Sequence, residues 1–376
     1  MIKKFYDLGH LNKPYKKNFI KNTKKIFDDG FYISGDFVRK FEKNFSKFNK
    51  SKYSIAVGNG YDAIRLSLEL FKYIKVCKQN DEVIVPSNSY IATILPVNAA
   101  GLKPVFVEPE KKGLNLDPME LKKKINKKTK IVIVTHLYGH VAQMDEILKI
   151  TKKHNIKVIE DCSQAHGASY ENKYSGNFGD IGCFSLFPSK NLGAIGDAGI
   201  ITTNNKNYEK ILRSLRNYGE ENFTNYGDRK YKNILKGFNS RMSELDAVLL
   251  NLKLKDLKKN NLDKSKKANF YLKNIKNKLI ELPIIKKNSR PVWHQFLILA
   301  KDRNKLKKYL KHNGYETKIV YPIPPHRQIA YKEMKDKNYP ITDYIHNKNL
   351  CLPIESHFNY GDLKKIVNLI NKFDFK

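Results

Sequence analysis

Short apolar runs alternate with helical patterns over residues 82–203 of this 376-residue chain. Each run is long enough for one strand and is apolar at most positions, which is typical of strands covered on both faces. The pattern therefore predicts an α/β protein with a mostly parallel sheet between helices. The predicted strands are residues 82–85, 104–107, 131–135, 157–160, 183–187 and 199–203, and helices are predicted at 114–125 and 144–154.

The pattern changes after residue 243. A long helical pattern, interrupted by lysine-rich stretches, runs from residue 244 to about 278, and shorter apolar and helical segments follow at 292–299, 304–312 and 363–373. We predict a large α/β domain over residues 12–250, together with an N-terminal segment 1–11, and a smaller α+β domain over residues 251–376 that includes the connecting helix. The chain is 41% hydrophobic, which is enough to fill both cores.

One lysine stands between a short apolar strand and a glycine-rich turn. The strand at 183–187 is expected to end at Pro188, because proline cannot donate to a sheet ladder. Gly193 and Gly196 then permit backbone conformations closed to other residues. Lys190 is therefore expected at a fixed strand end. Lysine is abundant throughout this chain, so only its context makes Lys190 a candidate for covalent catalysis.

An aspartate supplies that context. Residues 157–167 are typical of a buried strand followed by a polar turn, and Asp161 falls at the carboxyl end of the strand. Ligands of open α/β sheets bind outside the carboxyl ends of strands. The pair Asp161 and Lys190 suits pyridoxal phosphate, since the lysine forms a Schiff base with the aldehyde and the aspartate keeps the pyridine nitrogen protonated. The alternative is that Asp161 only caps a following helix.

A phosphate group needs a separate cradle. Gly58 and Gly60 precede an apolar helical pattern, and the free amides at such a helix start attract anions. Two glycines before a helix are also compatible with a simple turn. Ser185, five residues before Lys190, offers a hydroxyl to the same group or merely fills a strand position.

These residues also carry a family resemblance. The sequence Phe-Pro-Ser-Lys-Asn-Leu-Gly at 187–193 is followed by Gly-Asp at 196–197, and a second signature covers residues 236–247. Together with the strand that ends in Asp161, they make the chain resemble the DegT/DnrJ/StrS sugar aminotransferases from about Asn12 to the C-terminus. These are pyridoxal-phosphate enzymes of the aspartate aminotransferase fold (fold type I). The continuation after Lys190 resembles the branch that aminates C3 of nucleotide-linked 3-keto-6-deoxyhexoses.

The resemblance implies a role for individual residues. Lys190 would form the Schiff base, Asp161 would pair with the pyridine nitrogen, and Gln164 would contact the ring hydroxyl. The implied phosphate ligands are the amides of Gly60 and Tyr61, the hydroxyl of Ser185 and, from the partner subunit, Asn239. The active site would therefore need a homodimer. Tyr90 corresponds to an aromatic residue that stacks on the cofactor ring in relatives, and otherwise is an ordinary core residue.

One position departs from the family pattern. Where some relatives carry a tyrosine three residues before the lysine, this chain has Phe187, which offers no hydroxyl. Attention therefore moves to His326, which follows a proline-rich segment and resembles the sugar-facing histidine of the family. The alternative for His326 is a solvated loop histidine.

The implied reaction is a ping-pong transfer. L-glutamate leaves its nitrogen on the cofactor, and a dTDP-linked 3-keto-6-deoxyhexose collects it, giving an amino sugar for a surface polysaccharide. A neutral Lys190 serves as both tether and base, and a desolvated pocket lowers the pKa of a lysine. The alternatives are an aminotransferase acting at C4 of a 4-keto sugar and a dehydratase, which the presence of Lys190 disfavours.

The charge of the chain raises a rival class of function. There are 71 Lys and Arg residues against 37 Asp and Glu residues, a formal net charge of +34, which suggests nucleic-acid binding. The lysines are spread along the chain, as at 122–124 and 258–259, and no nucleic-acid-binding signature accompanies them. We therefore expect no specific nucleic-acid partner. The positive field would instead attract an anionic nucleotide-sugar.

Membrane and metal signals are weak in this sequence. No apolar run approaches the roughly 20 residues that span a bilayer, and the start of the chain lacks an apolar core of secretory length. We therefore expect a cytoplasmic protein without a membrane partner. The cysteines at 77, 162, 183 and 351 show no metal-type spacing, so reduced thiols and no metal are expected.

Overall fold

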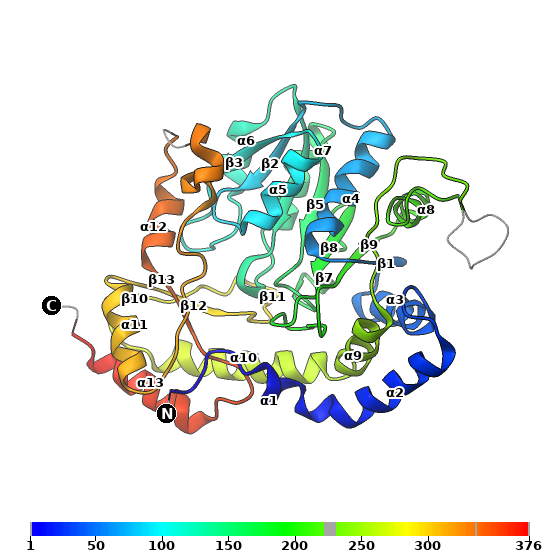
Figure 1. The fold of residues 1–376 in the computed structure, drawn as a ribbon. Coiled ribbons are helices and arrows are strands. Elements are labelled where there is room, and N and C mark those ends of the chain that lie inside the picture. The colour runs from blue at the N-terminus through cyan, green and yellow to red at the C-terminus, as the bar shows by residue number, and fades with distance from the viewer. Residues whose placement is uncertain (1, 222–230, 335–336, 375–376) are drawn as a thin grey trace.

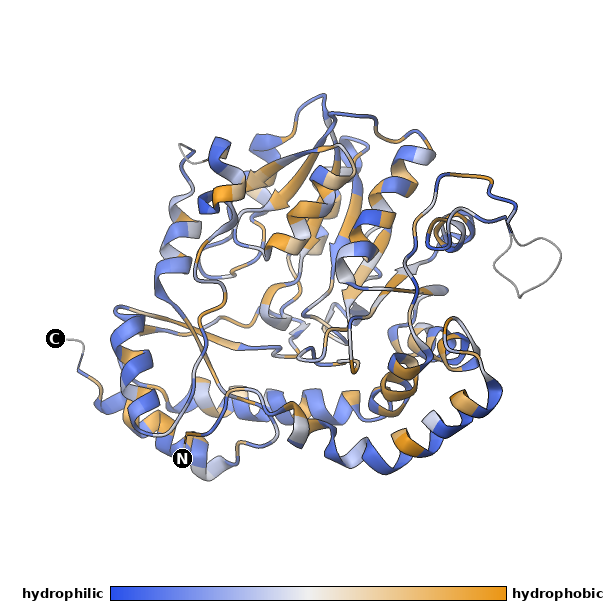
Figure 2. Cartoon of the chain, viewed as in Figure 1, coloured by the Kyte–Doolittle hydropathy of each residue, from blue (hydrophilic) through white to orange (hydrophobic). Residues whose placement is uncertain are grey.

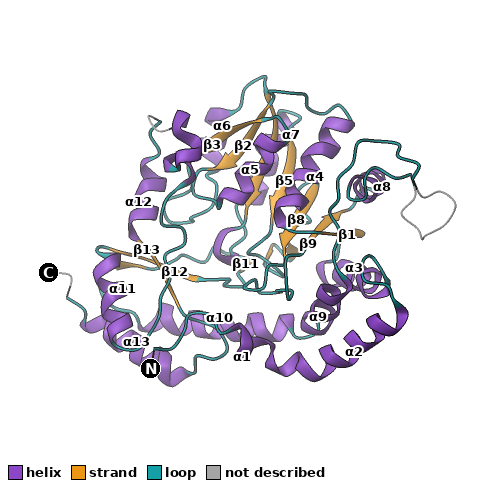
Figure 3. Ribbon diagram, viewed as in Figure 1, coloured by secondary structure: helices purple, strands orange, loops and turns teal. Residues whose placement is uncertain are grey.

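The computed structural model describes residues 2–221, 231–334 and 337–374. Over these ranges a seven-stranded sheet with the order β1-β9-β8-β5-β4-β2-β3 forms the centre of the fold (Figures 1 and 3). Strand β9 is antiparallel to β1 and β8, and the other neighbouring strands are parallel. The predicted mostly parallel mixed sheet is thus confirmed. The strands are β1 (Tyr53–Val57), β2 (Glu82–Pro86), β3 (Lys103–Val107), β4 (Thr129–Thr135), β5 (Lys157–Asp161), β8 (Ile181–Ser185) and β9 (Gly199–Thr203).

Apolar side chains cover both faces of the sheet. Val83 and Val85 belong to one buried cluster and Ile84 belongs to another, because successive residues of a strand point to opposite faces. Helices close both clusters, and Figure 2 shows the apolar strands between helices that carry hydrophilic stretches. None of the helices in the described ranges is long and apolar enough to cross a membrane. The helices of this part are α3 (Asp36–Asn49), α4 (Gly60–Tyr73), α5 (Ile91–Ala99), α6 (Pro118–Lys124), α7 (Met144–Lys153) and α8 (Lys206–Leu215).

A second, smaller sheet lies beside the first and has the order β10-β12-β13. The long helix α10 runs along the lower edge of Figure 1, from α9 to this second unit. A third sheet, β11-β6-β7, joins two parts of the chain that are far apart in sequence. The elements are α9 (Glu244–Leu254), α10 (Leu257–Asn274), β10 (Ile280–Glu281), β12 (Phe296–Ala300), α11 (Arg303–His312), α12 (Pro340–Lys348), β13 (Asn349–Leu352), α13 (Tyr360–Lys372), β6 (Ser169–Tyr170), β7 (Lys173–Tyr174) and β11 (Ser289–Arg290).

The start of the chain packs on its end. The N–H of Lys3 donates to the carbonyl of Gly314 at 2.9 Å, and Lys3 Nζ lies 2.6 Å from a carboxylate oxygen of Asp362 on α13. After these residues the chain passes under the sheet through α1 (Leu8–Asn12) and α2 (Lys16–Asp29). Short 3-10 helices complete the elements: η1 (Lys13–Tyr15), η2 (Leu137–Gly139), η3 (Pro325–Arg327) and η4 (Ile329–Met334).

Some predicted element bounds are wrong. The strand expected to reach Phe187 ends at Ser185, where its pairing with Gly199 of β9 ends, and Phe187 is 49% exposed. The helix expected from residue 114 begins at Pro118, because Leu114 adopts a positive φ of 63° and Asp117 caps the helix. The helical pattern at 244–278 is two helices that are separated at residues 255–256, and β1 was not predicted.

Candidate active site

The carboxyl ends of the parallel strands gather the predicted residues at one edge of the sheet. Asp161 is the last residue of β5, and Ser185 is the last residue of its neighbour β8. Strand β1 runs in the same direction, since it and β8 are both antiparallel to β9, and it leads directly into Gly60 at the start of α4. This edge is where ligands of open α/β sheets bind.

Lys190 is held in a turn after β8. Its N–H donates to the carbonyl of Phe187 at 2.8 Å. Burial of the ammonium group lowers the pKa of Lys190 to about 8, and the carboxylate of Asp161 raises it in part. A substantial fraction of Lys190 is therefore a neutral amine at mildly alkaline pH, while Asp161 supplies negative charge nearby.

The carboxylate of Asp161 is buried and bonded on both oxygens. Thr93 on α5 donates its hydroxyl to Oδ2 at 2.6 Å, and the N–H of Ser163 donates to Oδ1 at 3.1 Å. The structure places turns after β5, and the next helix in the described ranges begins at Lys206. Asp161 therefore does not cap a following helix, and that alternative is wrong.

The start of α4 packs closely against β8 and is the candidate anion cradle. A Cβ atom on Gly60 would lie 2.6 Å from Cβ of Ser185, so only glycine lets the two backbones approach this closely. Asn59 caps the helix by accepting from the N–H of Asp62 at 2.7 Å. Among the described hydrogen bonds none uses the N–H of Gly60 or Tyr61 as donor, which leaves both amides free for an anion.

An amide and two aromatic rings line the other side of this edge. Gln164 Oε1 accepts the N–H of Tyr138 at 2.6 Å, so the Nε2 group of Gln164 faces away and donates to the hydroxyl of Tyr321 at 3.0 Å. The ring of Tyr321 stacks on Tyr90, with centroids 4.8 Å apart and an angle of 27° between the rings. Tyr90 is 50% exposed, so the alternative of an ordinary core aromatic is wrong.

Tyr321 was missed from the sequence, although it precedes the proline-rich segment from which His326 was selected. His326 itself is fully buried, and its Nε2 lies 3.0 Å from Oδ1 of Asp343. The alternative of a solvated loop histidine is therefore wrong. The described hydrogen bonds and ion pairs link His326 to Asp343 rather than to Lys190 or Asp161.

Asn239 lies at the surface beside the cradle. The next residue, Ser240, accepts the N–H of Gly58 at 2.9 Å and donates its hydroxyl to Asp62 at 2.7 Å. Asn239 is therefore an exposed residue on a segment that is bonded to the start of α4. Its side chain can be reached by a second molecule.

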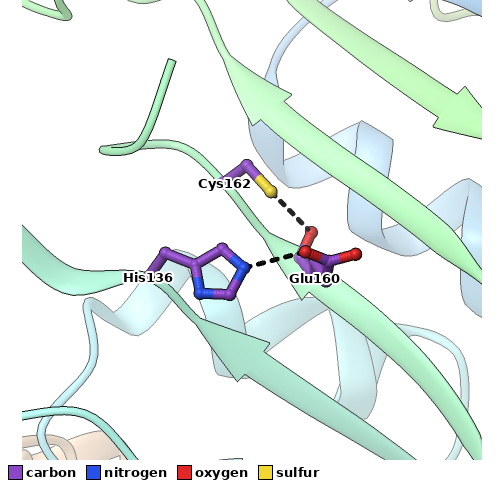
Figure 4. A group of neighbouring side chains, drawn as sticks. All are labelled: His136, Glu160 and Cys162. Atoms are coloured by element: carbon purple, nitrogen blue, oxygen red, sulfur yellow. Dashed lines mark hydrogen bonds and ion pairs between the residues drawn. The ribbon is translucent and has the colours of Figure 1, made fainter. Parts of the chain in front are cut away.

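One group of potential metal ligands lies behind this site. His136, Glu160 and Cys162 converge in the interior (Figure 4). The carboxylate of Glu160 accepts the N–H groups of Gly176, Phe178 and Gly179 and lies 2.9 Å from Nε2 of His136. Since Nδ1 of His136 accepts the N–H of Ala142, these ligand atoms are already used, and the group fastens a loop to β5.

Taken together, the residues present suit a ligand with an anionic end and a basic ring. The cradle offers free amides at Gly60, the buried carboxylate of Asp161 suits a protonated ring nitrogen, and Lys190 has an amine whose pKa is close to neutral. The oxygen of Gln164 is occupied and its Nε2 donates one N–H to Tyr321, which leaves a second N–H that suits a ring oxygen. Pyridoxal phosphate combines these features.

Comparison with known proteins gives consistent matches. The sequence matches the model of the DegT/DnrJ/EryC1/StrS aminotransferase family over residues 14–371. It is 41% identical, over 99% of both chains, to a dTDP-3-amino-3,6-dideoxy-α-D-galactopyranose transaminase of Aneurinibacillus thermoaerophilus. It is 33% identical to a dTDP-3-amino-3,4,6-trideoxy-α-D-glucose transaminase of Streptomyces venezuelae, covering 93% of this chain and 90% of the other.

Solved structures agree with these matches. S. venezuelae DesV superposes with a TM-score of 0.92 at 32% identity, and the alignment covers 99% of this chain and 98% of that one. Bacillus subtilis NtdA with the bound cofactor PMP superposes with a TM-score of 0.90 at 28% identity, covering 98% of this chain and 84% of that one.

Proposed function

Because this chain belongs to the DegT/DnrJ/EryC1/StrS aminotransferase family, and is thus a pyridoxal-phosphate-dependent aminotransferase, we propose that it moves an amino group from L-glutamate to C3 of a dTDP-linked 3-keto-6-deoxyhexose. The observation that carries the choice of substrate is the 41% identity over 99% of both chains with the transaminase of A. thermoaerophilus. The product is then a dTDP-3-amino-3,6-dideoxyhexose. We further propose that it is made in the cytoplasm for a surface polysaccharide.

Asp161 and its two hydrogen-bond donors are proposed to set the charge of the cofactor ring. When bound, pyridoxal phosphate supplies an aldehyde that condenses with amines and a protonated ring that withdraws electrons. We propose that Asp161 holds the proton on the ring nitrogen, while Thr93 and the N–H of Ser163 fix the direction of its carboxylate. We propose that Gln164, whose Nε2 donates to Tyr321, uses its second N–H for the ring hydroxyl, and that the half-exposed Tyr90 offers a stacking surface.

Lys190 carries the cofactor and moves the proton. Its Nζ attacks only as a neutral amine, and burial makes that form available from about pH 8 upward. A neutral Nζ would then take a proton from the α-carbon of the amino donor and, in the second half-reaction, give one to C3 of the sugar. Gly60, Tyr61 and Ser185 hold the phosphate, and His326 remains our candidate for a residue that faces the sugar.

A homodimer would complete the site. Large apolar side chains are exposed beside the Lys190 loop. The N–H of Glu244 donates to the carbonyl of Tyr32, a bridge joins Ile33 to Ser243, and the N–H of Gly196 donates to Asp246 on α9, so the segments that carry these side chains lie together. An apolar patch of this kind marks an interface between proteins. Its members are Tyr32, Ile33, Ile195 and Leu245, between 37% and 54% exposed. We propose that this patch meets a second copy, whose Asn239 reaches the phosphate.

Mixing two inactive variants tests the shared site. Lys190→Ala lacks the amine, and Asn239→Asp places a negative charge next to the phosphate. If Asn239 acts across the interface, the mixed dimer contains one site with both defects and one intact site. Random pairing then restores about a quarter of the wild-type activity. No recovery, with mass measurements showing that mixed dimers form, would mean that Asn239 acts within its own chain.

Absorbance spectra test the reaction and the position of amination. The protein with pyridoxal phosphate should show a visible band that L-glutamate converts to a near-ultraviolet band. Adding keto sugars one at a time, as dTDP and UDP derivatives with the ketone at C3 or C4, should restore the visible band only with the dTDP-linked 3-keto-6-deoxyhexose. Restoration by a 4-keto sugar would move the chemistry to C4, the alternative function. No visible band with pyridoxal phosphate would contradict the aminotransferase assignment.

A further inference from the structure

The residue that follows Lys190 is bonded at every polar atom of its side chain. Nδ2 of Asn191 donates to Oδ1 of Asn261 and to the carbonyl of Val292, both at 3.0 Å. Its Oδ1 accepts from Nζ of Lys264 at 3.2 Å and lies 3.3 Å from Nδ1 of His294. These partners use the full capacity of a side-chain amide. The backbone next to Lys190 is thereby fixed to helix α10 and to the segment before β12.

A second bond holds the same loop from α9. The buried Nζ of Lys253 donates to the carbonyl of Gly193 at 2.7 Å. At Gly193 a Cβ atom would lie only 2.2 Å from the carbonyl oxygen of Pro188, so the loop closes tightly on itself. The turn that carries Lys190 is therefore fastened on both sides of residue 192.

Behind Asn191 lies a buried ion pair. Nζ of Lys264 is 2.6 Å from Oε1 of Glu355, and both side chains are 8% exposed. Nζ of Lys267 also donates to the backbone carbonyl of Glu355 at 2.9 Å. Glu355 follows β13, so a single chain of contacts connects the Lys190 loop, the long helix and the C-terminal unit. Buried ion pairs add little net stability. We therefore expect this pair to fix the positions of the segments that it joins.

Two buried imidazoles lie near the two lysines. Burial, together with the positive charges of Lys190 and Lys264, lowers the pKa of His166 to about 3. The pKa of His294 is lowered well below its usual value by burial and by the same two lysines. Both histidines are thus neutral. His294 Nδ1 lies 3.3 Å from Oδ1 of Asn191, the same atom that accepts from Lys264, so the ring, the ion pair and the Lys190 loop form one connected group.

We propose that Asn191 and the buried Lys264–Glu355 pair are positioning residues that hold the amine of Lys190 in its reactive place. They act through the loop and do not touch the substrate. This inference rests on the proposed role of Lys190. Loosening the loop admits water around Nζ, which weakens the desolvation that keeps this amine neutral.

The test measures how the apoprotein captures pyridoxal phosphate at different pH values. Two variants remove contacts at opposite ends of this chain of contacts. One is Asn191→Ala, and the other is the double variant Lys264→Met/Glu355→Leu, which removes both charges at once. In each we expect the midpoint of the pH dependence to rise by about one unit, and the capture rate at pH 8 to fall about fivefold. A buried ion pair that is replaced by apolar residues commonly leaves a protein as stable as before, so the double variant should unfold near the wild-type temperature.

A matched control separates positioning from a general effect on folding. The Lys286–Glu110 pair, 2.7 Å apart, also joins segments distant in sequence, and its described bonds do not involve the Lys190 loop. Lys286→Met/Glu110→Leu should keep the wild-type midpoint. The inference is overturned if either loop variant melts like the wild type and also keeps the wild-type midpoint. If the wild type itself captures no cofactor, the proposed function fails instead.

Discussion

Replacing Lys190 with alanine is expected to lower the rate of amino transfer by at least about 10³-fold, because one side chain provides both the covalent tether and the mobile proton. Burial lowers the pKa of Lys190 to about 8 and Asp161 raises it in part, so the amine that can become neutral lies close to that carboxylate. The visible absorbance band of the cofactor should disappear as well, since it requires a link to Nζ.

The measurement follows single-turnover amination of the keto sugar and the absorbance spectrum on the same sample. Lys206→Ala is the matched control, because Lys206 is an exposed lysine at the start of α8, and it should behave as the wild type. Transfer by Lys190→Ala at a rate near that of the wild type would remove Lys190 from the mechanism.

Replacing Asp161 with asparagine is the second change with a large expected effect. The amide of asparagine can accept the N–H of Ser163 on its oxygen and donate from its nitrogen to the hydroxyl of Thr93, so the site keeps its shape, but the negative charge at the ring nitrogen is lost. We expect turnover to fall on the order of 10²- to 10⁴-fold. Asp161 raises the pKa of Lys190, so removing its charge should move the midpoint of cofactor capture below about pH 8.

The direction of this shift distinguishes loss of the Asp161 charge from loosening of the Lys190 loop. Asp161→Asn should lower the midpoint, whereas loosening the loop at Asn191 should raise it. Asp180→Asn serves as the control, because Asp180 accepts the N–H of Val158 near the other end of β5. A midpoint that stays unchanged in Asp161→Asn would show that the carboxylate and the amine are not coupled.

Lys190 and Asp161 could be predicted because their signals are local. Asp161 is the last residue of an apolar strand and Lys190 lies in the turn that follows another, and parallel strands bring such ends to the same edge of a sheet. The ladder with β9 sets the true end of β8 at Ser185, and the sequence of β8 alone does not contain that information.

The partners of these residues could not be predicted in the same way. Tyr321 reaches Gln164 from the C-terminal unit, and Asn191 is held by Lys264 on a helix that ends far along the chain. Such contacts depend on how the two units pack together, and this packing is not encoded in the periodicity of strands or helices. His326 shows the same limit, since its burial against Asp343 depends on the position of α12.

The contacts of Lys3 bear on the order in which the protein folds. Lys3 bonds to Gly314 and Asp362, and the pair Lys3–Asp362 is 359 residues apart in the sequence. The segment that carries Lys3 therefore finds these partners only after the whole central sheet between them has been synthesised. Contacts over so long a sequence separation form slowly, so this docking belongs to the last stage of folding.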